Sequence, residues 1–208
     1  MREELQRLGY GRFWSARYIS DDQWTDLKGA LPRRFKLERD ARIAGMSSMR
    51  TYNRVGKASE RGILQRPLNH PGAAIGIKLR CFAAPIMETV GAWMRLELKD
   101  RTCLICNQNA VEDAEHFTSK CTFYDDLRKE CQQRLLKIIG AESQLELRRA
   151  VEDLRVDIFL GDKLLANLPD ELRMKFDSTI CGFLKKAWRR REEVWKTLCV
   201  GDNPWQLR

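Results

Sequence analysis

Apolar side chains recur at helical spacing along most of this chain, and the alternation typical of a half-buried strand is scarce. Across residues 123–138 they fall three or four positions apart, and Gly140 closes the run. A longer run starts near Pro169 and continues through Trp188 to Leu198. The pattern predicts an all-α fold with a small irregular loop and little or no strand.

The N-terminal third of the chain is rich in helix breakers. Asp21 or Asp22 is expected to open a helix that turns Trp24 and Leu27 inward. The basic stretch that follows is broken by a proline and by two of its glycines, which predicts two or three short helices joined by polar turns. These breaking residues are Pro32, Gly45 and Gly56.

Two more helices are marked by their end signals. The helix that follows the turn at residues 69–72 has to stop or kink at Pro85, because proline lacks the amide hydrogen that a helix needs. Ser143 and Glu146 form a capping box for another helix, which is expected to bury apolar residues from 147 to 158. These signals predict helices on both sides of a cysteine-containing segment.

A chain of 208 residues can bury a sizeable core, and its 43% apolar and 32% charged residues are typical of a globular protein. No apolar run approaches the roughly 20 residues that a membrane-spanning helix needs, so no membrane insertion is expected. We expect three regions that pack as one globular unit. They are a basic helical region at 1–72, a cysteine-containing region with flanking helices at 73–140, and a C-terminal helical region at 141–208.

The net charge of +9 lies entirely in the first half of the chain. Residues 1–102 contain 20 Lys and Arg against 11 Asp and Glu, whereas residues 103–208 contain 18 of each kind. Within the first half, residues 32–66 hold ten basic and three acidic side chains. A polyanion is the natural partner of such a stretch, and the alternative is a solvated basic surface without a partner.

Seven cysteines, an odd number, and the lack of an apolar signal segment argue against a secreted disulfide framework. Three of them combine with a histidine in the spacing C-x2-C-x9-H-x4-C, made by Cys103, Cys106, His116 and Cys121. Zinc prefers thiolates and a neutral imidazole in tetrahedral array, and four protein ligands leave no open position for a reacting water. The motif therefore predicts one structural Zn2+. The other cysteines, expected as buried thiols in a reducing compartment, are Cys81, Cys131, Cys181 and Cys199.

Other cysteine and histidine chemistries fit these residues less well. A thioredoxin-like C-x-x-C is followed by a helix, whereas the residues from Asn107 to Asn109 are typical of a turn. A zinc deaminase carries H-x-E ahead of its P-C-x-x-C, which is the reverse of the order here. The H-E-x-x-H motif of metalloproteases is absent. A structural metal remains the favoured interpretation.

Further residues around the motif carry a resemblance to a known family. They are Lys78-Leu-Arg-Cys81, Arg101-Thr-Cys103, Glu112-Asp-Ala-Glu-His116-Phe117, and Cys121 followed by Tyr124 and Arg128. Together they cover about 55 residues and resemble the C-terminal CCHC zinc-binding region of non-LTR, LINE-type retrotransposon reverse transcriptase polyproteins. In that family the region follows the polymerase domain and is similar to a nucleic-acid-binding knuckle, which implies contact with RNA or DNA.

The catalytic sets of such a polyprotein are not expected here. The string from Phe123 to Asp126 matches the F/Y-x-D-D of a polymerase, but the helical pattern turns Asp125 and Asp126 toward solvent. A polymerase also needs a β-hairpin, a third carboxylate and several hundred more residues. Pro169-Asp170 is typical of a helix start and not of an endonuclease motif. We expect a protein that is not an enzyme.

The function expected from the sequence is a zinc module that binds RNA or DNA largely through backbone phosphates. Phe117, Tyr124 or Tyr52 is a candidate for stacking on unpaired bases, but for Phe117 and Tyr124 packing against the next helix is favoured. The expected phosphate contacts are Arg33, Arg34, Lys36, Arg50, Arg54, Lys57, Arg101, Lys120, Arg128 and Lys129. The alternative is a retroelement-derived structural subunit or protein-interaction module of a larger ribonucleoprotein, for example an organellar one. Either role implies an intracellular protein of the nucleus or of a ribonucleoprotein particle, with an organelle left open.

Overall fold

The computed structural model describes residues 2–7, 9–11, 18–46, 49–55, 70–139, 145–161, 163–165 and 168–198. The structure is 76% helical and the described part of the chain contains no strand or sheet, which confirms the predicted all-α fold. An isolated antiparallel bridge pairs Thr102 with Val111. None of the described helices is both long enough and apolar enough to cross a membrane.

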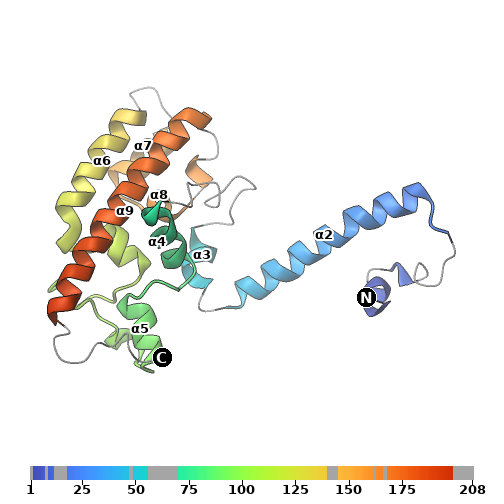
Figure 1. Ribbon diagram of the computed structural model, residues 1–208, viewed down its shortest axis with the longest axis horizontal. Coiled ribbons are helices and arrows are strands. Elements are labelled where there is room, and N and C mark those ends of the chain that lie inside the picture. The colour runs from blue at the N-terminus through green and yellow to red at the C-terminus, as the bar shows by residue number, and fades with distance from the viewer. Residues whose placement is uncertain are drawn as a thin grey trace. The chain divides into compact units, whose positions relative to one another are not determined.

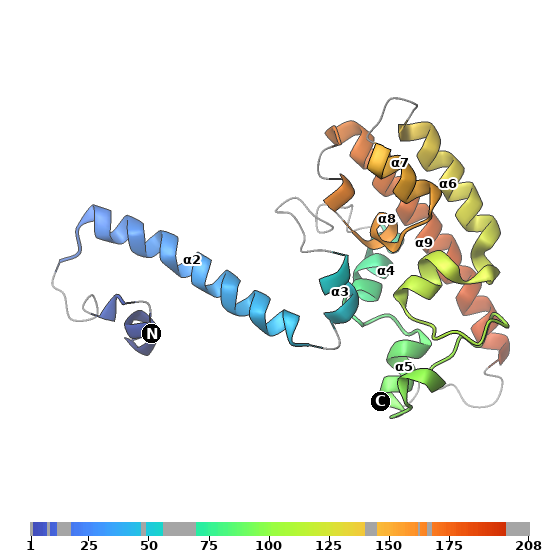
Figure 2. The same ribbon diagram turned by 180° about the vertical axis from the view of Figure 1, so that it is seen from behind.

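The helices differ widely in length (Figures 1 and 2). The α-helices are α1 (Arg2–Arg7), α2 (Asp21–Ala44), α3 (Arg50–Arg54), α4 (Pro71–Arg80), α5 (Met87–Trp93), α6 (Asp125–Ile139), α7 (Leu145–Glu152), α8 (Val156–Leu160) and α9 (Asp170–Leu198). Short helical turns are η4 (Leu98–Asp100), η5 (His116–Lys120), η6 (Thr122–Tyr124) and η7 (Lys163–Leu165). The chain divides into two compact units, Met1–Ser47 and Ser48–Arg208, and the expected boundaries at residues 72 and 140 stay a prediction.

In the first unit, α2 is opened by a capping box. Ser20 Oγ accepts a hydrogen bond from the Gln23 N–H at 3.3 Å, and Gln23 Oε1 accepts one from the Ser20 N–H at 3.2 Å. The predicted break at Pro32 is wrong, because α2 continues through this proline to Ala44. Proline removes the hydrogen bond to the carbonyl of Lys28, and both residues are exposed, so water can replace the missing donor.

Most of the surface of α2 is exposed. Leu27 is buried, but Trp24 is 46% exposed, so the expectation that both point inward is wrong for the tryptophan. Phe35 and Leu37 are also exposed. The helix ends at Gly45, where the sequence predicted a break. Since the helix buries so little apolar surface, its cations are left in contact with solvent.

In the second unit, α9 is the central helix, and both α4 and α6 pack along it (Figures 1 and 2). α7 contacts α6, and α8 contacts α4, so these helices complete the layer around α9. The inward face of α9 predicted from the sequence is confirmed for its central part. Its buried members are Ile180, Phe183, Leu184, Ala187 and Trp195.

α4 approaches α9 closely because Gly72 lies at the contact. A side chain at this position would meet the backbone of Cys181, since an added Cβ would lie 1.9 Å from its carbonyl oxygen. The helix starts at Pro71, and the ring nitrogen Nδ1 of His70 accepts a hydrogen bond from the Gly72 N–H at 3.1 Å. It ends at Arg80, before Pro85, as the sequence predicts.

The helix predicted to run from 147 to 158 is two helices in the structure, α7 and α8. Leu154 has a φ of +49°, a left-handed conformation that ends α7. The N–H of Arg155 donates to the carbonyl of Ala150 at 3.0 Å, which caps the last turn in the manner usually seen with glycine. The predicted capping residue Ser143 lies outside the described residues.

The expectation of buried thiols is confirmed for Cys131 and Cys181, which are 3% and 0% exposed. Burial raises the pKa of Cys131 to about 12, so this thiol stays protonated. Cys81 is half-buried, and Cys199 lies outside the described residues.

Candidate metal centre

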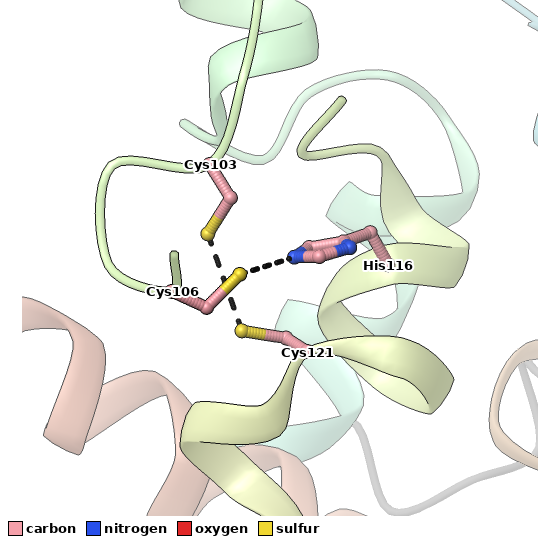
Figure 3. Close-up of side chains that lie close together, drawn as sticks. All are labelled: Cys103, Cys106, His116 and Cys121. Atoms are coloured by element: carbon pink, nitrogen blue, oxygen red, sulfur yellow. Dashed lines mark hydrogen bonds between the residues drawn. The ribbon is translucent and has the colours of Figure 1, made fainter. Parts of the chain in front are cut away.

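The four predicted ligands come from the segment between α5 and α6. The bridge between Thr102 and Val111 closes a short loop, and the N–H of Cys103 donates to the carbonyl of Ala110 at 2.8 Å. The chain turns at Asn109, whose φ of +49° is a left-handed conformation that asparagine tolerates better than most residues. The closed loop turns the sulfurs of its two cysteines toward a common point (Figure 3).

His116 and Cys121 come from one wide helical turn, η5. In an α-helix, residues five positions apart point about 140° away from each other. Here the N–H of Cys121 donates to the carbonyl of His116 at 2.7 Å, so the turn holds one residue more than an α-helical turn. The His116 N–H is itself held by Asp113 Oδ1 at 2.7 Å. The wide turn brings the imidazole and the thiol to face the loop cysteines (Figure 3).

The geometry of the cluster fits a tetrahedral metal ion such as zinc. The four ligand atoms lie within 4.8 Å of one another. Cys103 Sγ is 4.0 Å from Cys121 Sγ, and Cys106 Sγ is 3.2 Å from His116 Nε2. Zinc–sulfur bonds of about 2.3 Å place two tetrahedral sulfurs about 3.8 Å apart, and a sulfur and a nitrogen about 3.6 Å apart. The motif predicted from spacing alone is therefore one cluster in space.

The cluster is buried, with exposed fractions of 8% or less for all four side chains. A hydrogen bond from the Cys121 thiol lowers the pKa of Cys103 to about 3, and the same contact raises the pKa of Cys121. Burial raises the pKa of Cys106. One thiolate thus forms readily while the other two thiols hold their protons. A divalent cation fits this donor set, because coordination to a cation stabilises every thiolate.

Arg128 corrects one of the expected phosphate contacts. It is 1% exposed, and its Nη2 donates to the carbonyl of Cys121 and to the carboxylate of Asp125. The guanidinium is therefore part of the interior and holds the backbone at a candidate ligand. The prediction that Arg128 faces a nucleic acid is wrong, whereas its neighbour Lys129 is exposed.

Arg101 is likewise turned into the protein. Its Nε and Nη2 donate to the carbonyl of Leu96 at 3.0 and 2.7 Å, and its Nη1 donates to the carbonyl of Glu88 at 3.1 Å. The side chain lies against Gly91, where an added Cβ would be 2.5 Å from its Cγ. The expected phosphate contact at Arg101 is thus occupied by backbone carbonyls.

The arginines of α3 pair with acidic residues next to the cluster. Arg50 contacts Glu88 and lies 3.8 Å from Asp113, while Arg54 and Lys120 both pair with Glu115. Burial raises the pKa of Glu88, and the charge and hydrogen bond of Arg50 partly offset this. Arg50, Arg54 and Lys120 remain about half-exposed or more, but each already has an anionic partner.

Two of the three expected contacts on α2, Arg33 and Lys36, are exposed. Arg33 is exposed and donates from Nε to the Gly29 carbonyl at 2.9 Å. Arg34 pairs with Glu38 at 2.6 Å, whereas Lys36 is exposed without a partner among the described residues. Lys57 lies outside the described residues.

The aromatic residues beside the cluster pack inward, which was the favoured expectation. Phe117 and Tyr124 are 0% and 1% exposed, and their rings meet edge to face at 5.0 Å. Phe117 also meets the ring of Trp188 on α9 at 5.8 Å. Stacking of these rings on bases is ruled out by their burial, and they join the cluster to α9.

The paired aspartates at the start of α6 face solvent, as expected from the helical pattern. Asp125 is 52% exposed and Asp126 is 63% exposed. Arg190 on α9 binds both oxygens of Asp126 at 2.6 and 2.7 Å and lowers the pKa of that carboxyl to about 2. Both carboxylates thus serve in ion pairs.

Glu112 and Arg191 form a buried ion pair next to the loop that Thr102 and Val111 close, and the sequence pattern predicted no role for either residue. A signal was present in the sequence. Arg191 lies four residues after Ala187 and four before Trp195, on the apolar face of α9. A cation at such a position requires a buried anionic partner.

No model of a known protein family, no curated protein and no solved structure matches this chain.

Proposed function

We propose that this chain is a zinc-organised nucleic-acid-binding module that holds RNA or DNA mainly through backbone phosphates. The proposal depends on two observations. Three cysteines and one histidine form a buried cluster with tetrahedral spacing, and α2 presents several exposed cations. Four protein ligands fill the coordination sphere of zinc, so the metal has a structural role. The module is non-catalytic and is related to the C-terminal region of LINE-type polyproteins.

The cations of α2 supply the phosphate contacts. Arg33, Lys36, Arg39 and Arg42 follow at intervals of three residues, so each is a neighbour of the next on the helix surface, and all four are exposed. Arg39 pairs with Asp40, an interaction of little strength in solvent. Contacts of this kind position a nucleic acid without reading its sequence.

The salt dependence of binding tests this proposal. Fluorescence anisotropy of labelled single-stranded RNA, single-stranded DNA and duplex DNA would be measured between about 50 and 200 mM salt. The combined variant Arg33→Gln, Lys36→Gln, Arg42→Gln should bind more weakly. The slope of log affinity against log salt should fall by about 2 to 3, because each phosphate contact contributes about 0.7 to 0.9.

The matched control removes the same charge from the second unit. It replaces Lys78, Lys137 and Lys185 by glutamine, three exposed residues outside the proposed contacts. The control should keep a slope within about 1 of the original chain. Equal losses in both variants, or no salt-dependent binding by the original chain, would contradict the proposal.

A second candidate function is that of a protein-interaction module in a ribonucleoprotein. It is favoured by exposed apolar side chains that gather within residues 93–104, beside the candidate ligands. They are Trp93, Met94, Leu98 and Leu104, which are 64%, 59%, 44% and 53% exposed. Clustered exposed apolar residues are typical of protein contacts. A chain that binds metal but no nucleic acid at low salt would favour this function.

A further inference from the structure

Glu112 contacts three parts of the second unit: the loop that Thr102 and Val111 close, which is called the metal loop below, and the helices α5 and α9. Its carboxylate accepts three hydrogen bonds, from Arg191 Nε at 2.9 Å, from Arg191 Nη2 at 3.0 Å and from the Met87 N–H at 2.7 Å. Its backbone N–H donates to the carbonyl of Arg101 at 3.0 Å, and its carbonyl accepts from the N–H of Glu88 at 3.0 Å. Every polar group of this residue is therefore used to fix the loop.

Arg191 is prepared for this contact by its surroundings on α9. Its guanidinium lies 4.6 Å from the ring centre of Trp195 and 5.6 Å from that of Trp188. Both side chains of the Glu112–Arg191 pair are 2% exposed. The two rings restrict the guanidinium and exclude water, so it presents both nitrogens to one carboxylate.

We propose that Glu112 and Arg191 are positioning residues for the metal: through them α9 holds the loop in the shape that binds the ion. The inference rests on the proposed zinc site and names a support for it that lies outside the ligand motif. The metal affinity of this chain then depends on a helix that starts about fifty residues after the last ligand.

Glu112 lies between the two pairs of candidate ligands in the sequence, so the Glu112–Arg191 pair can position both. Glu112 directly follows Val111, whose bridge to Thr102 closes the loop of the two N-terminal cysteines. It also precedes His116 by four residues, at the start of the segment that carries the other two ligands. A shift of Glu112 would therefore move the sulfurs and the imidazole relative to each other.

The electrostatics agree with this placement. Burial acts to lower the pKa of Arg191, but the hydrogen bonds and the charge of Glu112 raise it. Arg191 therefore stays charged, and its two hydrogen bonds to the Glu112 carboxylate are charge-assisted.

The docking of α9 does not depend on this pair alone. α9 packs on α4 and α6, Lys186 binds Glu130, and Arg190 binds Asp126. Loss of the buried pair should therefore leave α9 in place and act on the loop. This distinguishes a positioning role from a general contribution to folding.

Titration of the full chain with Co2+ tests the inference, because the visible absorption of Co2+ reports a tetrahedral thiolate site. The variants are Glu112→Gln, which keeps the shape, and Arg191→Lys, which keeps the charge but cannot bind two oxygens. Each should weaken Co2+ binding by about 10- to 100-fold, the usual effect of losing a support of metal ligands. At saturating Co2+ each variant should show the same tetrahedral absorption spectrum as the original chain.

The matched control is Lys186→Gln, which breaks another ion pair of α9 and should leave Co2+ affinity within about twofold, as expected for an exposed pair. Circular dichroism of each variant would show that the helices are retained. Unchanged Co2+ affinity in both Glu112→Gln and Arg191→Lys would overturn the inference. Failure of the original chain to bind Co2+ would instead overturn the proposed zinc site itself.

Discussion

At the scale of single residues, neighbouring cations of this chain have opposite roles. Arg128 is buried against the backbone of Cys121, while Lys129 is exposed. Similarly, Arg190 binds an exposed aspartate, whereas Arg191 binds a buried glutamate. A helix turns by about 100° per residue, so adjacent positions face different environments. A basic run in a sequence is therefore not by itself evidence of a basic surface.

Replacement of Arg128 by methionine should destabilise the second unit by about 1 to 3 kcal/mol, because the carbonyl of Cys121 loses a buried donor. The same change at Lys129 should alter stability by less than about 0.5 kcal/mol. Equilibrium unfolding in urea measures both. Equal effects of the two substitutions would contradict the buried role of Arg128.

The sequence was sufficient to find the four ligands but not their support. Cys103, Cys106, His116 and Cys121 lie within nineteen residues, and their spacing alone indicates zinc. The partner of Glu112 lies 79 residues away, and nothing in the local pattern relates the two positions. Contacts of this range are set by how α9 packs, which a single sequence does not reveal.

At the scale of elements, helix positions were predictable, whereas the helix breaks were predictable only in part. The spacing of apolar residues located α6 and α9 well, because each buries one face over several turns. The break at Leu154 was missed, since this residue adopts a left-handed conformation that the sequence does not announce. At Pro32 the sequence predicted a break that the structure does not have. The helix continues because solvent can satisfy the carbonyl that proline leaves without a donor.

The two prolines at helix positions should respond differently to replacement by alanine. Pro32→Ala should stabilise α2 by about 1 to 3 kcal/mol, because the missing hydrogen bond is restored inside the helix. Pro71→Ala should be close to neutral, because the first position of α4 has no hydrogen bond to restore. Amide hydrogen exchange measures both effects. Unchanged protection of α2 in Pro32→Ala would contradict the description of this helix.

At the scale of the whole molecule, the cluster of three cysteines and His116 is the centre to which distant parts of the second unit are joined. Phe117 and Tyr124 pack toward α9, Arg191 reaches the loop from α9, and Arg54 of α3 pairs with the residue before His116. Loss of the ion should therefore affect helices on every side of the cluster, and not the loop alone.

The zinc content of the purified full chain tests the central claim most directly. Elemental analysis by mass spectrometry should find one zinc ion per chain, and Cys106→Ser should lose it because three ligands hold zinc much less well than four. Cys81→Ser, at a half-buried cysteine outside the cluster, should keep the full amount. A chain that contains no zinc after expression in zinc-supplemented medium, or a Cys106→Ser variant that retains it all, would contradict the account.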